Sequence, residues 1–287
     1  MKIIIIGSSG QLGQEFARLK SGHTLVPLTH EDIEVADKDR VNTIFSEQRP
    51  DTVINLAAFN RVDECEDKPD KAFQVNALGA RNVACAARAQ GSAVVFVSTD
   101  YVYSGERNPR RPYLESDPAM PLNVYGVSKL AGEHMTAQGN PDHWIIRTSG
   151  LYGVATSRKG WTFPELILKK AKAGESLRVV DDQVLTPTYT RDLAGVIMAV
   201  LEHGRTGIYH LTNGGQCSWY EFARTVLEMA GVDAEIIPIP SSAFPSKAHR
   251  PGYSVLESER LKPQGLKPMR HWKEALEAYL IEKGILS

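Results

Sequence analysis

The stretch KIIIIGSSGQLG at residues 2–13 constrains the fold more than any other part of the sequence. Four consecutive isoleucines predict a strand covered on both faces, since a half-exposed strand would alternate apolar and polar residues. Gly7, Gly10 and Gly13 follow this strand at once and lead into a helical pattern. Glycines in such a turn permit a tight bend and let a pyrophosphate approach backbone N–H groups at a helix N-terminus. The stretch predicts a dinucleotide-binding turn, with a purely structural turn as the alternative.

Strands and helices alternate through the first half of the chain. Short apolar runs predict strands over residues 2–6, 23–28, 52–57, 93–98 and 143–148. Helical patterns lie between them, over residues 11–20, 38–48, 69–90 and 123–138. This alternation predicts an α/β fold built on a Rossmann-like, doubly wound parallel sheet.

After residue 150 the pattern is looser and predicts a second, smaller lobe. Helices are expected over 161–174, 190–204 and 218–231 and at the C-terminal end, strands over 176–180 and 207–212, and a loop over 237–252. We expect residues 1–149 to form a NAD(P)-binding Rossmann lobe, to which residues 179–212 return. Residues 150–178 and 213–287 are expected to form a C-terminal α/β substrate-binding lobe.

The helix expected over 218–231 carries two further signals. Ser218 and Glu221 have the spacing of a capping box, in which each side chain binds the backbone N–H of the other residue. Trp219 and Phe222 lie at helical spacing and are expected in the core.

Composition excludes several classes of protein. The formal net charge is −1 without a run of like charges, so the sequence predicts no binding to nucleic acid or to an anionic membrane. The three cysteines lack a CxxC pair and predict reduced thiols, and the histidines show no metal-binding spacing. The N-terminal apolar run is too short for a signal peptide or a membrane span. We therefore expect a cytoplasmic protein.

The end of the second predicted strand bears on the choice of nicotinamide cofactor. An NAD site usually has an acid there to bind the ribose 2′-hydroxyl. This chain has Thr29 and His30 instead, with Glu31 and Asp32 only further on. The pattern favours NADP(H) and leaves NAD(H) open, although the sequence shows no obvious arginine to bind a 2′-phosphate.

Tyr125 and Lys129 lie four residues apart in the helix predicted over 123–138. Any helix places such a pair on one face, so the spacing alone also fits an ordinary surface pair. A cation beside a phenol lowers its pKa and lets it act as an acid near neutral pH. Ser98 and Thr99 end the fourth predicted strand, at the edge where a Rossmann sheet binds substrate. With the glycine turn, these residues predict reduction of a carbonyl that a strand-end hydroxyl binds and Tyr125 protonates.

The chain also carries a series of motifs in a fixed order. They are GSSGQLG, NLAAFNRVDECE, QVNALGARNVA, STDYVYSG, YGVSK, RTSGLYG, VVDDQVLTPTYTRDLA, CSWYEFA and RPGYS. The series resembles the extended short-chain dehydrogenase/reductases, and more closely the dTDP-4-dehydrorhamnose reductase family. The resemblance extends from residue 1 to about residue 280. It implies an oxidoreductase that uses NAD(P)H to reduce the C4 ketone of dTDP-4-dehydro-L-rhamnose, a nucleotide sugar, to dTDP-L-rhamnose.

The resemblance implies roles for individual residues. The implied catalytic set is Thr99, Tyr125 and Lys129. The implied cofactor contacts are Gly7, Gly10, Gln11, Leu12 and Gly13 at the pyrophosphate, Glu34 and Val35 near the adenine, Ala57, Ala58 and Phe59 under the adenosine and ribose, Asn76 on a helix behind the site, and Tyr125 and Lys129. The implied substrate contacts are Thr99, Asp100, Tyr125 and Arg250. A guanidinium suits a diphosphate, although Arg250 also fits a solvated loop residue.

The chain departs from the family pattern beside the expected sugar. Gly150 stands where the family usually has a tryptophan, and Trp161 is the candidate to replace that aromatic face. Thr162 and Phe163 stand where the family has Asn-Phe, and Asn60 replaces a threonine. These changes leave the expected reaction intact and make the identity of the sugar less certain.

The resemblance also raises the question of a metal and a dimer. Some family members bind magnesium at a dimer interface through glutamates. Glu15 matches one such position, whereas Arg191 stands where another acid would be expected. We therefore predict no metal, and a homodimer stays open.

Other functions remain compatible with the sequence. The chain could be another nucleotide-sugar 4-ketoreductase or an epimerase of the same superfamily. A 4,6-dehydratase fits less well, because it would carry Thr-Asp-Glu where this chain has Thr99, Asp100 and Tyr101. A non-catalytic NADP-binding regulatory subunit is the alternative from another class. The complete set of Thr99, Tyr125 and Lys129 argues against it.

Overall fold

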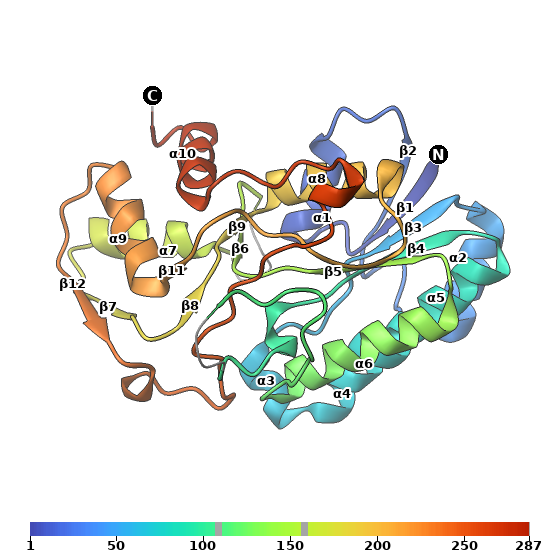
Figure 1. Ribbon diagram of the computed structural model, residues 1–287, viewed down its shortest axis with the longest axis horizontal. Helices are drawn as coiled ribbons and strands as arrows, with labels where there is room; N and C mark the ends of the chain where they lie inside the picture. The colour runs from blue at the N-terminus through green and yellow to red at the C-terminus, as the bar shows by residue number, and fades with distance from the viewer. Residues whose placement is uncertain (107–110, 156–159, 287) are drawn as a thin grey trace.

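A six-stranded, entirely parallel sheet forms the centre of the larger lobe (Figure 1). The computed structural model describes residues 1–106, 111–155 and 160–286. The strands stand in the order β10-β5-β4-β3-β1-β2. Their bounds are β1 Lys2–Ile6, β2 Thr24–Leu28, β3 Thr52–Asn55, β4 Ala93–Val97, β5 His143–Arg147 and β10 Gly207–His210. Parallel pairing brings all six carboxyl ends to one edge, so the predicted Rossmann-like α/β fold is confirmed.

The isoleucine run explains why helices cover both faces of the sheet. Ile3 and Ile5 pack into a cluster with residues of two helices, α1 (Gln11–Arg18) and α8 (Thr190–His203). The alternate residues, Ile4 and Ile6, pack into a second cluster on the opposite face, with α2 (Lys38–Gln48) and α5 (Ala80–Ala89). Because successive side chains of a strand point to opposite faces, a strand buried on both must be apolar at every position.

The helix expected over 69–90 is interrupted by a π-helical segment. It consists of α4 (Pro69–Phe73), the π-helix η1 (Gln74–Gly79) and α5. Helix α6 (Val124–Gly139) lies alongside this run and packs against both η1 and α5. Single π-helical turns often mark functional sites, and this one carries Asn76.

The smaller lobe has its own core and lies at the left of Figure 1. Its helices are α7 (Phe163–Lys172), α9 (Trp219–Met229) and α10 (Trp272–Glu282), and its strands β7 (Leu177–Val180) and β12 (Ile236–Ile239) pair in parallel. The loop predicted over 237–252 is therefore wrong at its start, where β12 forms. The capping box of Ser218 and Glu221 is confirmed, and so is the core position of Phe222; Trp219 packs against this core.

Short elements connect the two lobes. Strand β6 (Leu151–Tyr152) pairs with β9 (Thr188–Tyr189), and β8 (Val184–Leu185) pairs with β11 (Cys217–Ser218). Two 3₁₀ turns, η3 (Ser241–Ala243) and η4 (Lys262–Gln264), lie in the C-terminal part. Between them the chain runs back to the larger lobe and forms bridges to Tyr113 and Val184.

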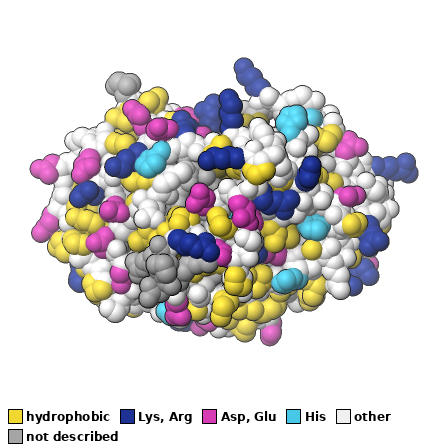
Figure 2. Space-filling view, viewed as in Figure 1, with side chains coloured by type: hydrophobic (Ala, Val, Ile, Leu, Met, Phe, Trp, Pro, Cys, Tyr) yellow, Lys and Arg dark blue, Asp and Glu magenta, His cyan; other side chains and the backbone are white. Residues whose placement is uncertain are grey.

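Charged side chains of both signs are dispersed over the face shown in Figure 2, in keeping with a net charge of −1. In the part of the chain that the structure describes, every helix is too short or too polar to cross a bilayer. The three cysteines are free thiols, and Cys65 and Cys217 are buried.

We predict that Gly132→Ala destabilises the protein, because a Cβ there would lie 2.2 Å from the Asn76 carbonyl oxygen and 2.7 Å from Cζ of Phe96. Such overpacking costs about 1–3 kcal/mol, which urea unfolding measures. Gly195→Ala in α8 is the control: no atom lies within 4 Å of its added Cβ, so better helix propensity should leave stability equal or higher. Equal effects of the two changes would contradict the prediction.

Candidate active site

The glycine turn after β1 has the shape of a pyrophosphate site. Gly7 has a φ of +81°, and a Cβ on Gly13 would lie 2.5 Å from the Gly7 carbonyl oxygen and 2.6 Å from Cα of Ser8. Gly10 caps α1, whose first turn contains no acidic residue. The first N–H groups of a helix have no partner within it and attract anions. The glycines permit this tight turn, and the backbone N–H groups of the first turn of α1, where Gln11 and Leu12 lie, fit the phosphates of a dinucleotide. The Leu12 side chain itself packs into the core.

The segment after β3 is fixed from behind by Asn76. The Asn76 side chain is fully buried; its Oδ1 accepts the Phe59 N–H at 2.8 Å, and its Nδ2 donates to the Phe59 carbonyl at 3.1 Å. The same Nδ2 lies 2.9 Å from Oγ of Ser128 on α6. Ala57 and Ala58 precede Phe59 and lie beyond the carboxyl end of β3. These hydrogen bonds occupy both polar atoms of the Asn76 amide. The side chain therefore positions the segment 57–59 and has little hydrogen-bonding capacity left for a cofactor.

The loop after β2 holds the predicted adenine residues. Val35 is buried, whereas Glu34 is half-buried and accepts the Ala36 N–H at 3.1 Å. Nδ1 of His30 lies 3.5 Å from the Glu34 carboxylate. Arg40, which the sequence reasoning missed, donates from Nε and Nη2 to the Asp32 carbonyl at 3.3 and 3.2 Å. Arg40 lies on α2, and only the folding of the chain brings it to the segment after β2. The spacing of residues in the sequence therefore does not predict this contact.

Tyr125 stands at the start of α6, against the segment that follows β4. Asn123 caps the helix by accepting the Gly126 N–H at 2.8 Å. Thr99 caps the 3₁₀ turn η2 (Asp100–Val102), and its hydroxyl lies close enough to the phenol of Tyr125 to affect the pKa of that phenol. The rings of Tyr101 and Tyr125 meet edge to face with centroids 5.9 Å apart. The structure thus brings Thr99 and Tyr125 together as predicted.

Burial raises the pKa of Tyr125 well above its ordinary value, and the nearby Thr99 hydroxyl opposes this only in part. The expectation that Lys129 lowers the phenol's pKa is wrong for this geometry. The Lys129 ammonium donates instead to the Val97 carbonyl at 2.6 Å and lies 3.9 Å from the centre of the Phe96 ring. Burial lowers the pKa of Lys129 to about 7, against the opposing effect of Glu133.

Asp100 joins the catalytic segment to the C-terminal part of the chain. Its carboxylate is 4% exposed and accepts hydrogen bonds from Oγ of Ser254 at 2.6 Å and from Oγ1 of Thr99 at 3.1 Å. Burial raises the pKa of Asp100 to about 6, and these hydrogen bonds lower it in part. Asp100 was predicted to bind substrate, and its bonds here orient Thr99 and hold Ser254.

Arg250 lies at a cavity beside α3 (Val62–Asp67) and is tied to that helix. Its Nη2 lies 3.1 Å from the Asp63 carboxylate, which also accepts the N–H groups of Lys247 and Ala248 at 3.1 Å each. Lys247 forms a second ion pair, at 2.6 Å, with Asp67. The cavity has a volume of about 280 Å³ and is lined by Asn60, Arg61, Val62, Asp63, Glu64 and Arg250.

Gly150 has a left-handed backbone, with a φ of +54°. A Cβ there would lie 2.7 Å from Cδ1 of Leu185, so a tryptophan would need a different local backbone. Thr162 caps α7 through a capping box with Glu165. Phe163 stacks on Phe222 with ring centroids 5.5 Å apart, so it belongs to the core of the smaller lobe. Trp161 is 46% exposed.

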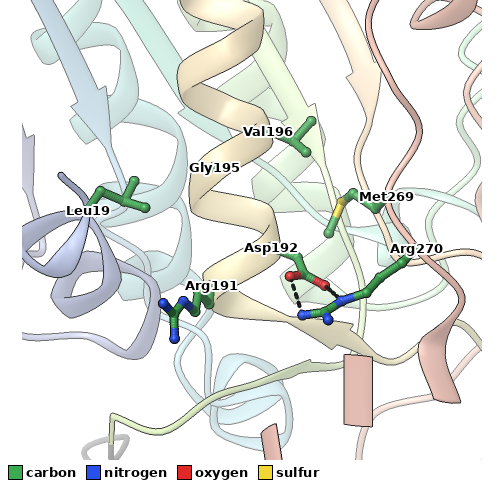
Figure 3. Close-up of a pocket in the computed structure, with 7 residues that line it drawn as sticks. All are labelled: Leu19, Arg191, Asp192, Gly195, Val196, Met269 and Arg270. Carbon is green, nitrogen blue, oxygen red and sulfur yellow. Dashed lines mark hydrogen bonds and ion pairs between the residues drawn. The ribbon is translucent and has the colours of Figure 1, made fainter. Parts of the chain in front are cut away.

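A second cavity, of about 380 Å³, lies between α1, α8 and the segment before α10 (Figure 3). It is lined by Leu19, Arg191, Asp192, Gly195, Val196, Met269 and Arg270. The Asp192 carboxylate forms a two-pronged ion pair with Arg270, at 2.7 and 2.8 Å. None of the predicted catalytic residues lines this cavity.

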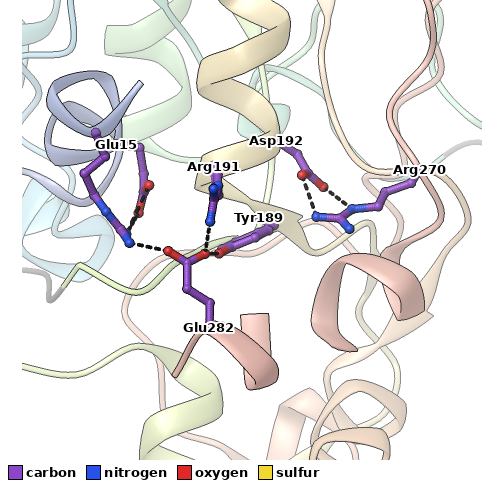
Figure 4. A network of polar contacts seen from close by, with 7 residues as sticks. Glu15, Tyr189, Arg191, Asp192, Arg270 and Glu282 are labelled. Carbon is purple, nitrogen blue, oxygen red and sulfur yellow. Dashed lines mark hydrogen bonds and ion pairs between the residues drawn. The ribbon is translucent and has the colours of Figure 1, made fainter. Parts of the chain in front are cut away.

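The carboxylates near this second cavity are paired with guanidinium groups (Figure 4). Glu282 of α10 accepts hydrogen bonds from Arg18, Tyr189 and Arg191. Arg18 also pairs with the buried Glu15, at 3.2 Å. Within the described ranges, no three His, Cys, Asp or Glu side chains are arranged to hold a metal ion. The geometry here is that of an ion-pair network, and the absence of a metal stays a prediction.

Comparison with known proteins agrees with this geometry. The family model described as the RmlD substrate binding domain matches residues 1–284. The spore coat polysaccharide biosynthesis protein SpsK of Bacillus subtilis is 40% identical over 98% of both chains. A dTDP-4-keto-6-deoxy-D-glucose reductase of Streptomyces niveus is 37% identical over 95% of this chain and 94% of its own. The solved dTDP-4-dehydrorhamnose reductase of Bacillus anthracis, a complex with NADP, superposes with a TM-score of 0.93 at 35% identity, covering 98% of this chain and 99% of that one.

These matches extend over nearly the whole chain and include the turn, the strand edge and the Tyr125–Lys129 helix. The protein belongs to the RmlD substrate binding domain family, which the sequence motifs predicted as the dTDP-4-dehydrorhamnose reductase family.

Proposed function

We propose that the protein is an NADPH-dependent oxidoreductase that reduces the C4 ketone of a nucleotide-activated 6-deoxy sugar, dTDP-4-dehydro-L-rhamnose, to dTDP-L-rhamnose. The observation that carries the proposal is that Thr99 and the phenol of Tyr125 lie together at the carboxyl edge of a sheet whose first turn fits a dinucleotide. The relatives from Streptomyces and Bacillus anthracis support it, because both are named as reductases of dTDP-activated keto sugars.

Tyr125 is the proposed acid of this reaction. A bound nicotinamide supplies the hydride that reaches C4. The raised pKa keeps the phenol protonated at neutral pH, so the proton is present when negative charge develops on the C4 oxygen. Thr99, buried beside the same phenol, would hold the carbonyl oxygen within reach of it. The buried Lys129 ammonium donates to the Val97 carbonyl, and its proposed part is to hold the nicotinamide ribose.

NADP(H) is the proposed cofactor. Gly7, Gly10 and Gly13, with the α1 N-terminus, would hold the pyrophosphate; Val35 and Glu34 would lie at the adenine. His30 and Arg40 are the basic side chains near the end of β2, where a 2′-phosphate would lie. The bound NADP of the Bacillus anthracis relative supports this choice over NAD.

The substrate is proposed to lie between the two lobes, with its diphosphate on Arg250. We take residues 1–149 and 179–212 as the cofactor lobe, and residues 150–178 and 213–287 as the substrate lobe. Asp63 would release the guanidinium when the diphosphate binds, since both are anions that Arg250 can pair with. The cytoplasmic location and the homodimer stay predictions.

A second candidate is reduction of a different dTDP-activated 4-keto-6-deoxy sugar. Gly150 favours it, because the aromatic face that the family usually has beside the sugar is missing. The relative from Streptomyces niveus is named for 4-keto-6-deoxy-D-glucose. A regulatory role without catalysis is disfavoured by the complete set of Thr99, Tyr125 and Lys129.

We predict that Tyr125→Phe lowers kcat by at least about 10²-fold, the scale of general acid catalysis, because the ring stays and only the proton donor is lost. Affinity for NADPH, measured by fluorescence titration, should change little. Tyr101→Phe is the matched control, since it removes a neighbouring phenol with no proposed proton transfer. Near-normal turnover of Tyr125→Phe would refute the catalytic assignment.

Arg250→Ala should raise the KM for the nucleotide sugar by roughly 10- to 100-fold, the value of a lost charge-assisted hydrogen bond. NADPH affinity should stay unchanged. Lys247→Ala removes the neighbouring ion pair with Asp67 and serves as the control for loosening of the loop. If both variants raise KM equally, Arg250 acts by holding the loop and does not bind the diphosphate.

A panel of dTDP-, GDP- and UDP-activated 4-keto-6-deoxy sugars tests the substrate. NADPH and NADH oxidation is followed at about 340 nm, the absorption of the reduced nicotinamide. We expect turnover of the dTDP sugars with NADPH preferred, and NMR of the product gives the configuration at C4. Absence of oxidation with every sugar would refute the reductase and favour the regulatory alternative.

A further inference from the structure

Glu133 is a buried carboxylate one helical turn beyond Lys129 on α6. Its side chain is 3% exposed. Its Oε1 accepts hydrogen bonds from Oγ of Ser98 at 2.5 Å and from Nε of Arg147 at 2.9 Å, and its Oε2 accepts from Nη2 of Arg147 at 2.6 Å. The carboxylate therefore joins three elements, which are α6, the end of β4 and the end of β5.

The hydrogen bond from Ser98 connects Glu133 to the residues proposed to carry out the reaction. Ser98 stands between Val97, whose carbonyl accepts a hydrogen bond from the Lys129 ammonium at 2.6 Å, and Thr99, which lies beside the phenol of Tyr125. The bond from the Ser98 hydroxyl to Glu133 therefore ties this part of the backbone to α6. Through Ser98, Glu133 holds the acceptor of Lys129 and the partner of Tyr125 in one arrangement.

Arg147 fixes the carboxylate from the other side. Its Nη1 donates to the Tyr103 hydroxyl at 2.6 Å, and this hydroxyl lies 2.9 Å from Nε2 of His210. Every polar atom of the Glu133–Arg147 pair that points into the core thus has a partner. Burying an ion pair is seldom stabilising in itself, and an apolar pair of similar size often serves stability as well. Stability alone is a weak reason for these charges.

The surroundings of Lys129 give the carboxylate an electrostatic role. Lys129 is 2% exposed, and burial lowers its pKa to about 7, whereas the negative charge of Glu133 raises it. Titratable and charged groups lie on α6 and on most of the elements that pack around it. They are Tyr125, Glu133 and His134 on α6 itself, Asp100 and Tyr101 on η2, His143 and Arg147 on β5, Asp63, Glu64, Cys65, Glu66 and Asp67 on α3, Asp70 and Lys71 on α4, and Arg81, Cys85 and Arg88 on α5. Only Glu133 has a resolved effect on the Lys129 amine.

We propose that Glu133 is a positioning residue of the reductase site: it fixes the Val97–Thr99 strand end through Ser98, and it places a negative charge four residues from Lys129 on the same face of α6. The inference rests on the proposed function, since it assigns Glu133 a part in that reaction. Glu133 touches neither substrate nor cofactor, and it acts through its two neighbours.

The test follows the Lys129 amine directly by NMR of protein labelled with ¹³Cε-lysine, the signal being assigned with Lys129→Met. Four further chains are compared with the wild type: Glu133→Gln, Glu133→Asp, the double variant Glu133→Gln with Arg147→Met, and Glu165→Gln. The last is the matched control, because Glu165 is also a partly buried, ion-paired glutamate but lies on α7 in the other lobe.

The wild-type signal should titrate near pH 7. In Glu133→Gln the midpoint should fall by about one pH unit or more, since an opposite charge is lost and the Arg147 guanidinium stays. The midpoint of the double variant should lie between those of the wild type and Glu133→Gln. The midpoint of Glu133→Asp should lie near that of the wild type, and the midpoint of Glu165→Gln should equal it. An unmoved midpoint in Glu133→Gln overturns the proposal. If that variant does not fold, the double variant decides by the same criterion.

Measurements of turnover then distinguish a failure of the Glu133 proposal from a failure of the proposed reductase activity. The pH above which kcat/KM falls should shift with the NMR midpoint in each variant, whereas a merely structural role would lower kcat without moving it. If the wild type reduces no sugar, the proposed function is refuted. The expected order of the Lys129 titration midpoints is then still tested by NMR, independently of activity. If the wild type is active and the midpoints do not move, the positioning role alone is refuted.

Discussion

The close contact between α6 and the rest of the larger lobe determines where the reactive groups stand. Gly126 faces the Tyr101 carbonyl and Gly132 faces the Asn76 carbonyl, and in both places a Cβ would lie 2.2 Å from the oxygen. The helix can therefore lie directly on backbone of η2 and η1. Tyr125 is next to the first contact, and Lys129 lies between the two. Any larger residue would lift the helix and move the phenol away from Thr99.

The same close packing explains the electrostatics of the site. Lys129, Glu133, Arg147 and Asp100 are each at most 4% exposed, and an unpaired charge at such a place would cost several kcal/mol. Hydrogen bonds to the end of β4 offset this cost. The Val97 carbonyl accepts from the Lys129 ammonium, and the Ser98 hydroxyl donates to the Glu133 carboxylate. The carboxyl edge of the parallel sheet thus supplies hydrogen-bond partners for the buried charged groups. These partners let the charges lie beside the proposed reaction, away from water.

Much of the fold could be predicted because its signals are local. The run Ile3–Ile6 requires burial on both faces, and the capping box of Ser218 and Glu221 starts a helix at a defined residue. The pair of Thr99 and Tyr125 could also be found, since strand order alone brings the ends of β4 and the start of α6 to one edge. The direction of the Lys129 side chain could not, because it depends on the Val97 carbonyl and the Phe96 ring rather than on spacing to Tyr125.

Long-range contacts explain the other differences. Strand β12 exists because Ile236–Ile239 pairs with β7. A stretch with Pro238 inside it and Pro240 directly after it carries no local sign of that pairing. Gly150 likewise lies where an added Cβ would meet Leu185 of β8, a contact that the local sequence does not reveal.

The substrate side of the site depends on the segment that returns from the smaller lobe. Lys247 and Arg250 pair with acids of α3, Asn123 donates to the His249 carbonyl at 2.8 Å, and Ser254 bonds Asp100. These bonds fasten one strip of chain to the helix that carries Tyr125 and to the turn that carries Thr99. Arg250, the proposed diphosphate ligand, stands on this strip, so the protein's own tertiary contacts would set a bound sugar against Thr99 and Tyr125. Since Gly150 has no aromatic side chain, the strip and the cavity lined by Asn60 and Arg250 are the parts of the proposed site left to select among sugars.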